Sequence, residues 1–314
     1  MDHQSKLIVM LILEIPSIVL SILIFIYFGM HREARSELRN HGWFILLIVN
    51  FFQLIIDLPM PLSYYYLSKI SPSTNAYCVW WTWCEFSFNS IGLFLMAWIS
   101  IERHIIVFHS HTMLEKQWKK WIFHFIPLIF CLIWPPLFYF VLVVISPSCI
   151  TEWDFNTVLC GFPCYFTNVS LSQFDFNFNL VIPIIIIMLA NVTLVIRVIY
   201  QKMSRQQMIN WRHHRKMVLQ LWIISSLYIG FWLPDIITVL VQITILPSFM
   251  DQQLETMEFV VYFIPLLLPM VCLTALPELM KKLKNIITRP QLNVIDVVHY
   301  NRRSKQMITV VAAR

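Results

Sequence analysis

The chain has 314 residues and a formal net charge of +6, and 58% of its residues are hydrophobic while only 13% are charged; soluble chains hold roughly 45–50% and 25%. With a mean hydropathy of +0.68 it carries more apolar surface than a soluble core can bury, and its 5 glycines exclude collagen-like and disordered classes. The composition therefore indicates a membrane protein.

Seven stretches are nearly free of charge and long enough to cross a bilayer as helices, because about 20 residues at about 1.5 Å each span a hydrocarbon core of roughly 30 Å. Barrel strands would be shorter and would alternate in polarity. We predict an all-α membrane protein, a seven-transmembrane helix bundle, with spans at residues 7–30, 43–67, 78–101, 121–145, 179–196, 217–246 and 259–280.

The first stretch is predicted to be a retained span and not a secretory signal. It is too long for the apolar core of a signal peptide, it contains Glu14 and Pro16, and it lacks a small-x-small cleavage site at its end. Only six residues precede it. We therefore expect no separate extracellular ligand-binding domain, so a ligand has to enter the bundle or its loops.

Basic residues predict the orientation of the bundle. All 23 Lys and Arg except Lys6 and Lys69 lie in segments 31–42, 102–120 and 197–216 or after residue 280, and basic residues in short loops stay on the cytoplasmic side. We expect an N-terminus outside, a cytoplasmic C-terminus and a multi-pass protein of the plasma membrane. The basic face is expected to contact anionic membrane lipid or a cytoplasmic partner, and not nucleic acid.

Four of the 7 cysteines lie at the predicted outer face, where disulfides persist: Cys78, Cys149, Cys160 and Cys164. The only histidine on that side is far from them, so we expect bridges and neither a metal site nor a cofactor. Four cysteines allow three pairings. In the same outer region, Asn168 begins an Asn-Val-Ser acceptor for N-glycosylation.

Four acids lie inside predicted spans, where ionisable groups are costly and usually face a cavity or a partner. They are Glu14, Asp57, Glu85 and Asp235. We treat them as the candidates for a functional site.

A set of short motifs occurs in order and in register with the spans. The members are Cys78, Glu102-Arg103-His104, Pro183, Phe231-Trp232-Leu233-Pro234, and Leu276-Pro277 followed by Lys281-Lys282-Leu283-Lys284. This set resembles the rhodopsin-like (class A) G-protein-coupled receptors, whose third helix opens with a bridged Cys and closes with Asp/Glu-Arg-Tyr at the same spacing. The resemblance implies a receptor domain over 1–290, ending in a short amphipathic helix, and a cytoplasmic tail over 291–314.

Several positions depart from the family pattern. The usual Asn-Pro-x-x-Tyr is replaced by Leu276-Pro277-Glu278-Leu279-Met280, the first span lacks a Gly-Asn pair, and Asn191 stands where a Tyr is usual. His214 occupies the place of an acid that pairs with the helix-three Arg in some members. The detail of switching is therefore expected to differ from the family pattern.

The resemblance implies that the chain binds a small-molecule or short-peptide ligand and activates a heterotrimeric G protein. It assigns the switch to Glu102, Arg103, His104, Pro234 and Pro277. Arg103 would pair with Glu102 in one conformation and meet the partner in another, although an arginine that only snorkels from a helix end is the alternative. The Pro234 kink would let the lower half of the sixth span swing.

Glu85 lies seven residues after Cys78, at the register where amine receptors of this family carry an Asp that pairs with a ligand ammonium. Trp81, Trp232 and Asp235 would complete an acidic and aromatic pocket for a cation. A protonated Glu85 bonded between helices is the alternative.

Two further assignments come from the resemblance. Asp57 resembles the acid that helps to bind sodium in many members, with a purely structural hydrogen bond as an equal alternative. Cys78 is expected to pair with Cys164 or Cys160, with a preference for Cys164.

Other functions fit the sequence less well. A seven-helix ligand-gated channel would need the amino end inside, and a transporter usually shows repeated halves with glycine-broken helices. The predicted spans hold no lysine for a retinal Schiff base, and among metal ligands for a membrane hydrolase only His124 stands near a span. We therefore expect that the protein is not an enzyme.

Overall fold

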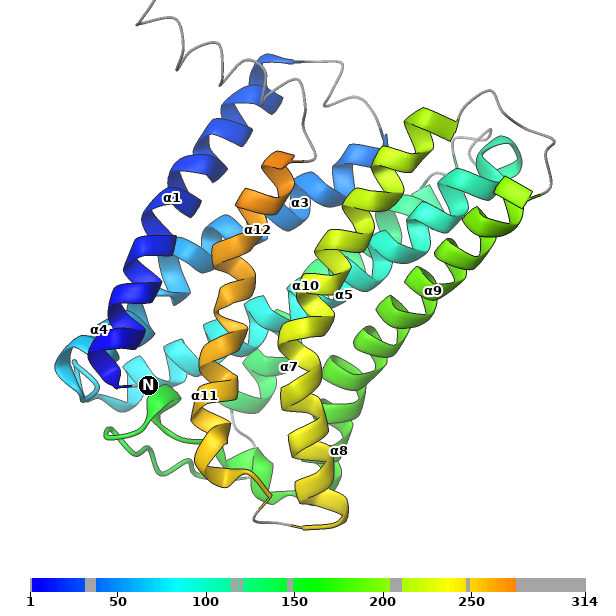
Figure 1. Ribbon diagram of the computed structural model, residues 1–314. Helices are drawn as coiled ribbons and strands as arrows, with labels where there is room; N and C mark the ends of the chain where they lie inside the picture. The colour runs from blue at the N-terminus through cyan, green and yellow to red at the C-terminus, as the bar shows by residue number, and fades with distance from the viewer. Residues whose placement is uncertain are drawn as a thin grey trace, which may run out of the picture. The chain divides into compact units, whose positions relative to one another are not determined.

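The computed structural model describes residues 2–31, 38–113, 118, 121–145, 149–203, 211–246 and 249–274. By its internal contacts the chain divides into Met1–Cys272, which contains the helix bundle, and Leu273–Arg314. The helices are α1 (His3–Met30), α3 (Leu38–Phe52), α4 (Pro59–Leu67), α5 (Asn75–Met113), α7 (Ile126–Tyr139), α8 (Val169–Asp175), α9 (Ile182–Met203), α10 (Trp211–Thr244), α11 (Asp251–Val261) and α12 (Phe263–Thr274) (Figure 1).

The predicted number of spans is confirmed, because seven helical stretches within the described ranges are long and apolar enough to cross a membrane. They are His3–Met30, Asn40–Leu67, Asn75–Ile105, Trp121–Ile145, Val169–Arg197, Leu221–Thr244 and Glu255–Leu273. The fifth begins at Val169 and not near residue 179. The polar residues of α8 hid this turn from a hydropathy reading, and the Asn168 side chain caps it by accepting from the Leu171 N–H at 3.4 Å.

Prolines shape the second and seventh spans. A wide helical turn over Gln53–Asp57 precedes Pro59, and the Leu58 N–H donates to Gln53 O five residues back at 3.0 Å. In α12, Pro269 has no N–H to offer the carbonyl four residues earlier. Asn50 Nδ2 donates to that Pro265 carbonyl at 3.0 Å instead, which joins the two spans.

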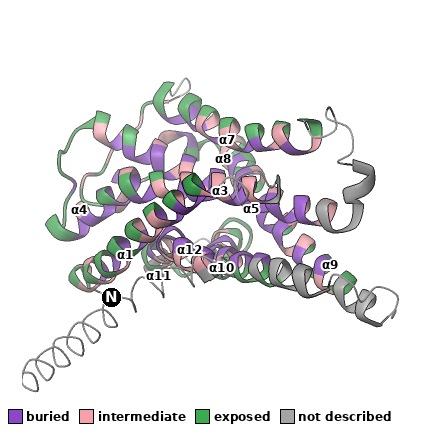
Figure 2. Cartoon of the chain, turned by 90° about the horizontal axis from the view of Figure 1, so that it is seen from above, coloured by how far each residue is buried: buried purple, intermediate pink, exposed green. Residues whose placement is uncertain are grey.

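Helix α5 is the central element of the bundle and packs against α3, α7 and α9. Leu93, Leu95 and Met96 on α5 are fully buried. Seen end on, buried residues lie mainly where helices face each other and exposed residues lie on the outer sides (Figure 2). Those outer sides carry large apolar residues such as Ile12 and Ile15 on α1, as expected of helices that contact lipid.

Two disulfides cross the loops at the end of the bundle where α5 begins, which we call the Cys78 end; the opposite end is the Arg103 end. Cys78 pairs with Cys160 (Cα–Cα 5.8 Å) and Cys149 with Cys164 (Cα–Cα 5.9 Å). The preference for a Cys78–Cys164 bridge was therefore wrong.

Local backbone conformation explains this pairing. Leu159, Cys160 and Gly161 all have positive φ, and this reversal carries the fully buried Cys160 onto α5, where Thr82 Oγ1 donates to Leu159 O at 3.4 Å. The Cys164 N–H donates to Thr151 Oγ1 at 3.1 Å, which holds Cys164 near Cys149. Sequence spacing alone carries no record of such a turn.

Asp175 ties the fifth span to the fourth and to the loop before it. Its carboxylate accepts from Tyr139 Oη, Tyr165 Oη and Asn179 Nδ2, each at 2.7 Å. Burial, and after it the charge of Asp175, raises the pKa of Tyr165 well above its ordinary value, so this hydroxyl stays a donor. Asp175 thus has a structural role at the Cys78 end.

In the Asp175→Asn variant we expect the free energy of unfolding to fall by about 1–2 kcal/mol, because a neutral amide accepts weaker hydrogen bonds than a carboxylate. Thermal unfolding in detergent micelles, followed by circular dichroism, measures the change as a lower Tm. Glu152→Gln is the matched control, since Glu152 is exposed in the neighbouring loop. An Asp175→Asn protein with an unchanged Tm would show that the three bonds do not stabilise the bundle.

Candidate functional site

Glu85 is the centre of a polar network that joins three spans near the Cys78 end. Its side chain is buried on α5. Asn89 Nδ2, one turn along the same helix, donates to Glu85 Oε1 at 2.7 Å, and Tyr262 Oη donates to Glu85 Oε2 at 3.1 Å. Gln53 Nε2 donates to Asn89 Oδ1 at 3.1 Å. Both carboxyl oxygens of Glu85 therefore have protein partners.

Asp57 lies beside this network, at the end of the wide turn in the second span. It is 0% exposed, and it is close enough to Glu85 for the two carboxyl groups to influence each other. Neither Asp57 oxygen makes a hydrogen bond of ordinary distance and angle among the described residues, and the buried Trp81 Nε1 has no acceptor there either. Buried polar atoms without partners are costly, so a polar ligand that bonded to them would be favoured.

The predicted pocket residues fall into two groups. Trp81 is fully buried and packs in the same cluster as Tyr65, Tyr262 and Phe259, and it lies close enough to Glu85 to affect its carboxyl group. Asp235 on α10 instead lies close enough to Glu258 for its charge to act on that carboxyl group, and the charge of Glu85 acts on Glu258 as well. The structure thus places three acids, Glu85, Asp235 and Glu258, in one electrostatic neighbourhood.

Trp232 stands apart from this network. It is buried on α10, two residues before Pro234, but its indole makes no hydrogen bond to any side chain of the Glu85 network within the described part of the chain. Its assignment as a ligand-binding residue stays a prediction.

A cation of the chain itself is held next to this site. Lys6 is 2% exposed, and its ammonium donates to Glu255 Oε1 at 2.6 Å. The same Nζ lies 5.3 Å from the ring centroid of Tyr65 and 5.4 Å from that of Phe259. Aromatic faces attract ammonium groups, so this end of the bundle already accommodates one.

Sequence reasoning missed several members of the site: Lys6, Tyr65, Asn89, Glu258 and Tyr262. Lys6 was treated only as a flanking charge. The spacing of Asn89 one turn after Glu85 was a usable signal, because residues four apart share a helix face. For Tyr262, Tyr65 and Glu258 there was no such signal, since their partners lie on other spans.

At the Arg103 end, His124 Nδ1 donates a hydrogen bond to Glu102 Oε1, and His41 Nδ1 lies 3.2 Å from His124 Nε2. Both Glu102 and His124 are buried. Gly42 allows α3 to approach closely here, because a Cβ at that position would meet Ile99 at 2.9 Å. Glu102 is thus held by a residue of the fourth span.

The two residues that follow Glu102 have other contacts. The guanidinium carbon of Arg103 lies 5.7 Å from the ring centroid of Trp43. His104 Nε2 donates to Ala190 O on α9 at 2.6 Å. The three motif residues therefore connect α5 to three different neighbours, at Trp43, His124 and Ala190.

Further predictions concern Pro234, Pro277, Asn168 and the binding of metal ions. Pro234 lies inside α10, and Thr238 Oγ1 donates to its carbonyl at 3.0 Å; Pro277 and the expected amphipathic helix and tail lie outside the described residues. Asn168 is exposed at the start of α8.

Among the described residues no group of three or more His, Cys, Asp or Glu side chains could hold a metal ion. The sodium role of Asp57 stays a prediction.

Two of the cavities lined by described residues open at the surface of the bundle, and neither of these two is lined by Glu85. One, of about 490 Å³, lies between α5 and α9 at the Arg103 end. The other, of about 450 Å³, lies along α8 and the start of α9. Glu85 itself is 5% exposed, so access to its carboxyl requires the surrounding side chains to move.

Comparison with known proteins gives one finding. A family model described as "7 transmembrane receptor (rhodopsin family)" matches residues 20–275. The match includes Asp57, Glu85, Glu102-Arg103-His104 and Pro234, and it ends before Leu276-Pro277. No curated protein matches the chain.

Proposed function

Because the chain belongs to the rhodopsin family of seven-transmembrane receptors, we propose that it binds a small cationic ligand near Glu85 and activates a heterotrimeric G protein at the Arg103 end. Members of this family are receptors and not enzymes, so a membrane hydrolase is excluded. The Cys78 end then faces outward at the plasma membrane, as the distribution of basic residues favours.

The observation that carries the ligand class is the group of buried polar atoms around Glu85. Asp57 Oδ1 and Oδ2 and Trp81 Nε1 are buried and make no hydrogen bond of ordinary distance and angle among the described residues, and both side chains lie close enough to Glu85 to act on its carboxyl group. An ammonium that donated to Asp57 and Glu85 would supply hydrogen bonds to the Asp57 oxygens and offset two neighbouring carboxyl groups, while Trp81 Nε1, itself a donor, would need an acceptor on the ligand. A cation fits this arrangement better than an anion or an apolar molecule.

The position of Lys6 supports the same ligand class. Its ammonium already makes the contacts expected of a bound amine, with one acid, Glu255, and two aromatic rings, Tyr65 and Phe259. Tyr65 lies in the same apolar cluster as Trp81. A ligand amine near Glu85 would therefore also meet an acid and an aromatic ring, Glu85 and Trp81.

Helix α5 links the two ends of the proposed receptor. Glu85 and Arg103 are separated by eighteen residues of one helix, or about 27 Å at about 1.5 Å per residue. A change in the packing of α5 at Glu85 would alter the contacts of Glu102 with His124 and of Arg103 with Trp43. Two discrete arrangements of these contacts would constitute the switch.

The proposed function is tested by a ligand screen with a G-protein readout. Purified receptor is mixed with a heterotrimeric G protein, and nucleotide exchange is measured with a panel of biogenic amines and short basic peptides. We expect at least one cationic compound to accelerate exchange. Ion current or substrate flux without any G protein would instead favour the channel or transporter alternative.

We propose that the Glu102–His124 pair restrains the Arg103 end in the resting receptor. In His124→Ala, basal nucleotide exchange is expected to rise by roughly two- to fivefold, because Glu102 loses its buried hydrogen-bond partner and the end of α5 is freed. Nucleotide exchange is measured without ligand and is normalised to the amount of purified, folded receptor. His31→Ala is the control, since His31 stacks on Tyr27 of α1. Basal exchange that stayed equal to wild type would remove the restraint from the mechanism.

Asn168 is proposed as a glycosylation site. Its Oδ1 caps α8, and the amide nitrogen that would carry the glycan is not used for that bond. Removal of the glycan with an amidase and loss of the mass shift in Asn168→Gln would support this assignment.

A further inference from the structure

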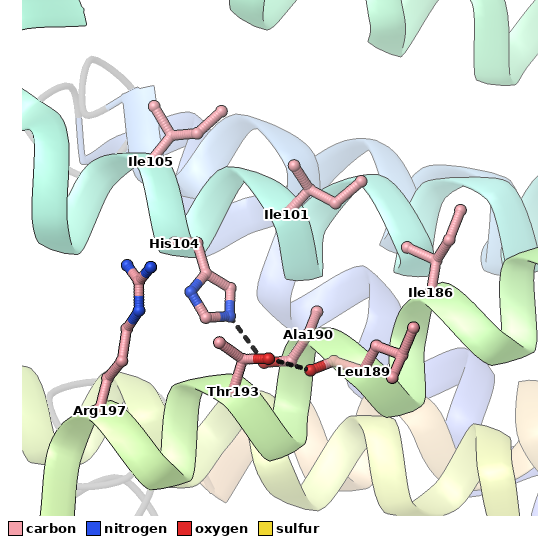
Figure 3. A pocket seen from close by; sticks show the side chains of 8 residues that line it. All are labelled: Ile101, His104, Ile105, Ile186, Leu189, Ala190, Thr193 and Arg197. Atoms are coloured by element: carbon pink, nitrogen blue, oxygen red, sulfur yellow. Dashed lines mark hydrogen bonds between the residues drawn. The ribbon is translucent and has the colours of Figure 1, made fainter. Parts of the chain in front are cut away.

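The cavity between α5 and α9 lies far along the bundle from Glu85 and is not used by the proposed function. It has a volume of about 490 Å³, within the range of roughly 300–1,000 Å³ typical of small-molecule sites. Its walls are mostly apolar, with Ile101 and Ile105 on α5 and Ile186 and Leu189 on α9 (Figure 3). Such walls suit a hydrocarbon chain.

The polar side chains of this groove, His104, Thr193 and Arg197, lie in the half away from Ile186, with Arg197 farthest along (Figure 3). His104 points across it to the Ala190 carbonyl, and Arg197 extends from α9 beside His104 and Ile105 (Figure 3). The guanidinium of arginine is always charged and matches phosphate geometry. The groove therefore combines an apolar length with a basic end.

The length of the groove matches one leaflet of a bilayer. Ile186 and Arg197 are eleven residues apart on α9, or about 17 Å at about 1.5 Å per residue. The hydrocarbon core of a bilayer is roughly 30 Å thick, so the groove covers about half of it. Arg197 then lies at the depth of the headgroups, where Lys and Arg contact anionic lipids.

We propose that this groove binds an anionic phospholipid of the leaflet at the Arg103 end, with one acyl chain along Ile186, Leu189 and Ile101 and the phosphate at Arg197. The assignment to the cytoplasmic leaflet rests on the proposed orientation. Because His104 bonds to α9 beside the groove and is adjacent to Arg103, a bound lipid holds α9 against α5 next to the switch. Lipid composition thereby acts on the packing of that end of the receptor.

The test uses the full chain in nanodiscs of phosphatidylcholine with phosphatidylserine, followed by native mass spectrometry of the lipids retained after release. Both nanodisc leaflets have the same composition, so the result does not depend on orientation. We expect wild type to retain phosphatidylserine over phosphatidylcholine. Arg197→Gln is expected to lower this preference roughly fivefold or more, since the phosphate loses its charged partner, and Ala190→Phe is expected to lower retention of both lipids by filling the groove.

Two matched control variants carry the same kind of substitution at positions outside the groove. Lys69→Gln removes one positive charge at the Cys78 end, and Val192→Phe adds the same ring to an outward position of α9 that is 56% exposed. Both are expected to retain lipid as wild type does. Equal retention in Arg197→Gln and wild type, or equal retention of the two lipids by wild type, would overturn the proposal.

A second measurement needs no variant and so does not depend on variants folding. Wild-type receptor in the same nanodiscs is irradiated with a phosphatidylserine that carries a diazirine in its acyl chain, and adducts are mapped by peptide sequencing. We expect enrichment in the segment 186–193 over the outward faces of the other spans. Adducts spread evenly over all spans would contradict a specific groove.

Discussion

Replacement of Glu85 by Gln is expected to lower the affinity of a cationic agonist about a hundredfold, or about 3 kcal/mol. The variant keeps the size and most of the hydrogen bonding of the side chain, since the new amide can still meet Asn89 and Tyr262, which bond to Glu85 in the wild type. It removes the charge that an ammonium would pair with. Competition binding with the amine found in the ligand screen measures the loss.

Two controls separate the loss of charge from other causes. Glu85→Asp keeps the charge and is expected to lose much less affinity. Glu255→Gln removes an acid at the same end that is 50% exposed and paired with Lys6, and it is expected to change affinity less than about threefold because the Glu255 carboxylate bonds to Lys6 and lies outside the Glu85 hydrogen-bond network. If Glu85→Gln bound every cationic agonist as wild type does, Glu85 would be only a structural residue between helices.

Replacement of Arg103 by Ala is expected to reduce agonist-stimulated nucleotide exchange roughly a hundredfold while ligand affinity stays within a few fold of wild type. Arg103 is buried against Trp43 in the structure. A buried guanidinium that moves to meet a partner supplies charged hydrogen bonds, and loss of such a contact costs about 2–5 kcal/mol. Exchange on the purified G protein and radioligand binding are measured on the same preparation.

Arg103→Lys tests whether the geometry of the side chain matters. A lysine keeps the charge but lacks the planar fork of donors, so we expect partial exchange. Lys69→Ala, at the opposite end, is the control for loss of a positive charge and should couple normally. An Arg103→Ala receptor that stimulated exchange as wild type does would leave Arg103 as a snorkelling residue at a helix end.

The two variants are informative together because they lie on one helix. Glu85→Gln is expected to shift the agonist concentration needed and to leave the maximal exchange rate intact. Arg103→Ala is expected to do the reverse. Loss of both properties in either variant would indicate that α5 no longer folds correctly, which the Tm of the purified receptor would reveal.

Much of the fold could be read from residue order. The charge-free stretches predicted seven spans, and the motifs from Cys78 to Pro234 indicated the family that the comparison confirmed. The errors lay where polar residues belong to helices or where a loop reverses. The start of the fifth span at Val169 was missed because α8 is polar. Cys164 was preferred over Cys160 because spacing does not encode the turn at Leu159-Cys160-Gly161.

The candidate site was predictable only in part. Glu85 and Trp81 could be named because both lie on one helix at known spacing from Cys78. The partners of Glu85 and Glu102 on other spans, Tyr262 and His124, could not be named. The sodium role of Asp57 and its structural alternative both stay predictions, and the proximity of Asp57 to Glu85 was not foreseen because the two residues lie on different spans.

The sequence alone determined that this protein folds in a lipid bilayer, how many times it spans the bilayer and in which loops its basic residues lie. Hydropathy, length and charge are properties of consecutive residues. Only the tertiary structure decided that Tyr262 reaches Glu85, that His124 bonds to Glu102 and that the Lys6 ammonium lies over the rings of Tyr65 and Phe259. These contacts depend on the rotation and depth of each helix against its neighbours. Side-chain packing over the whole bundle sets both.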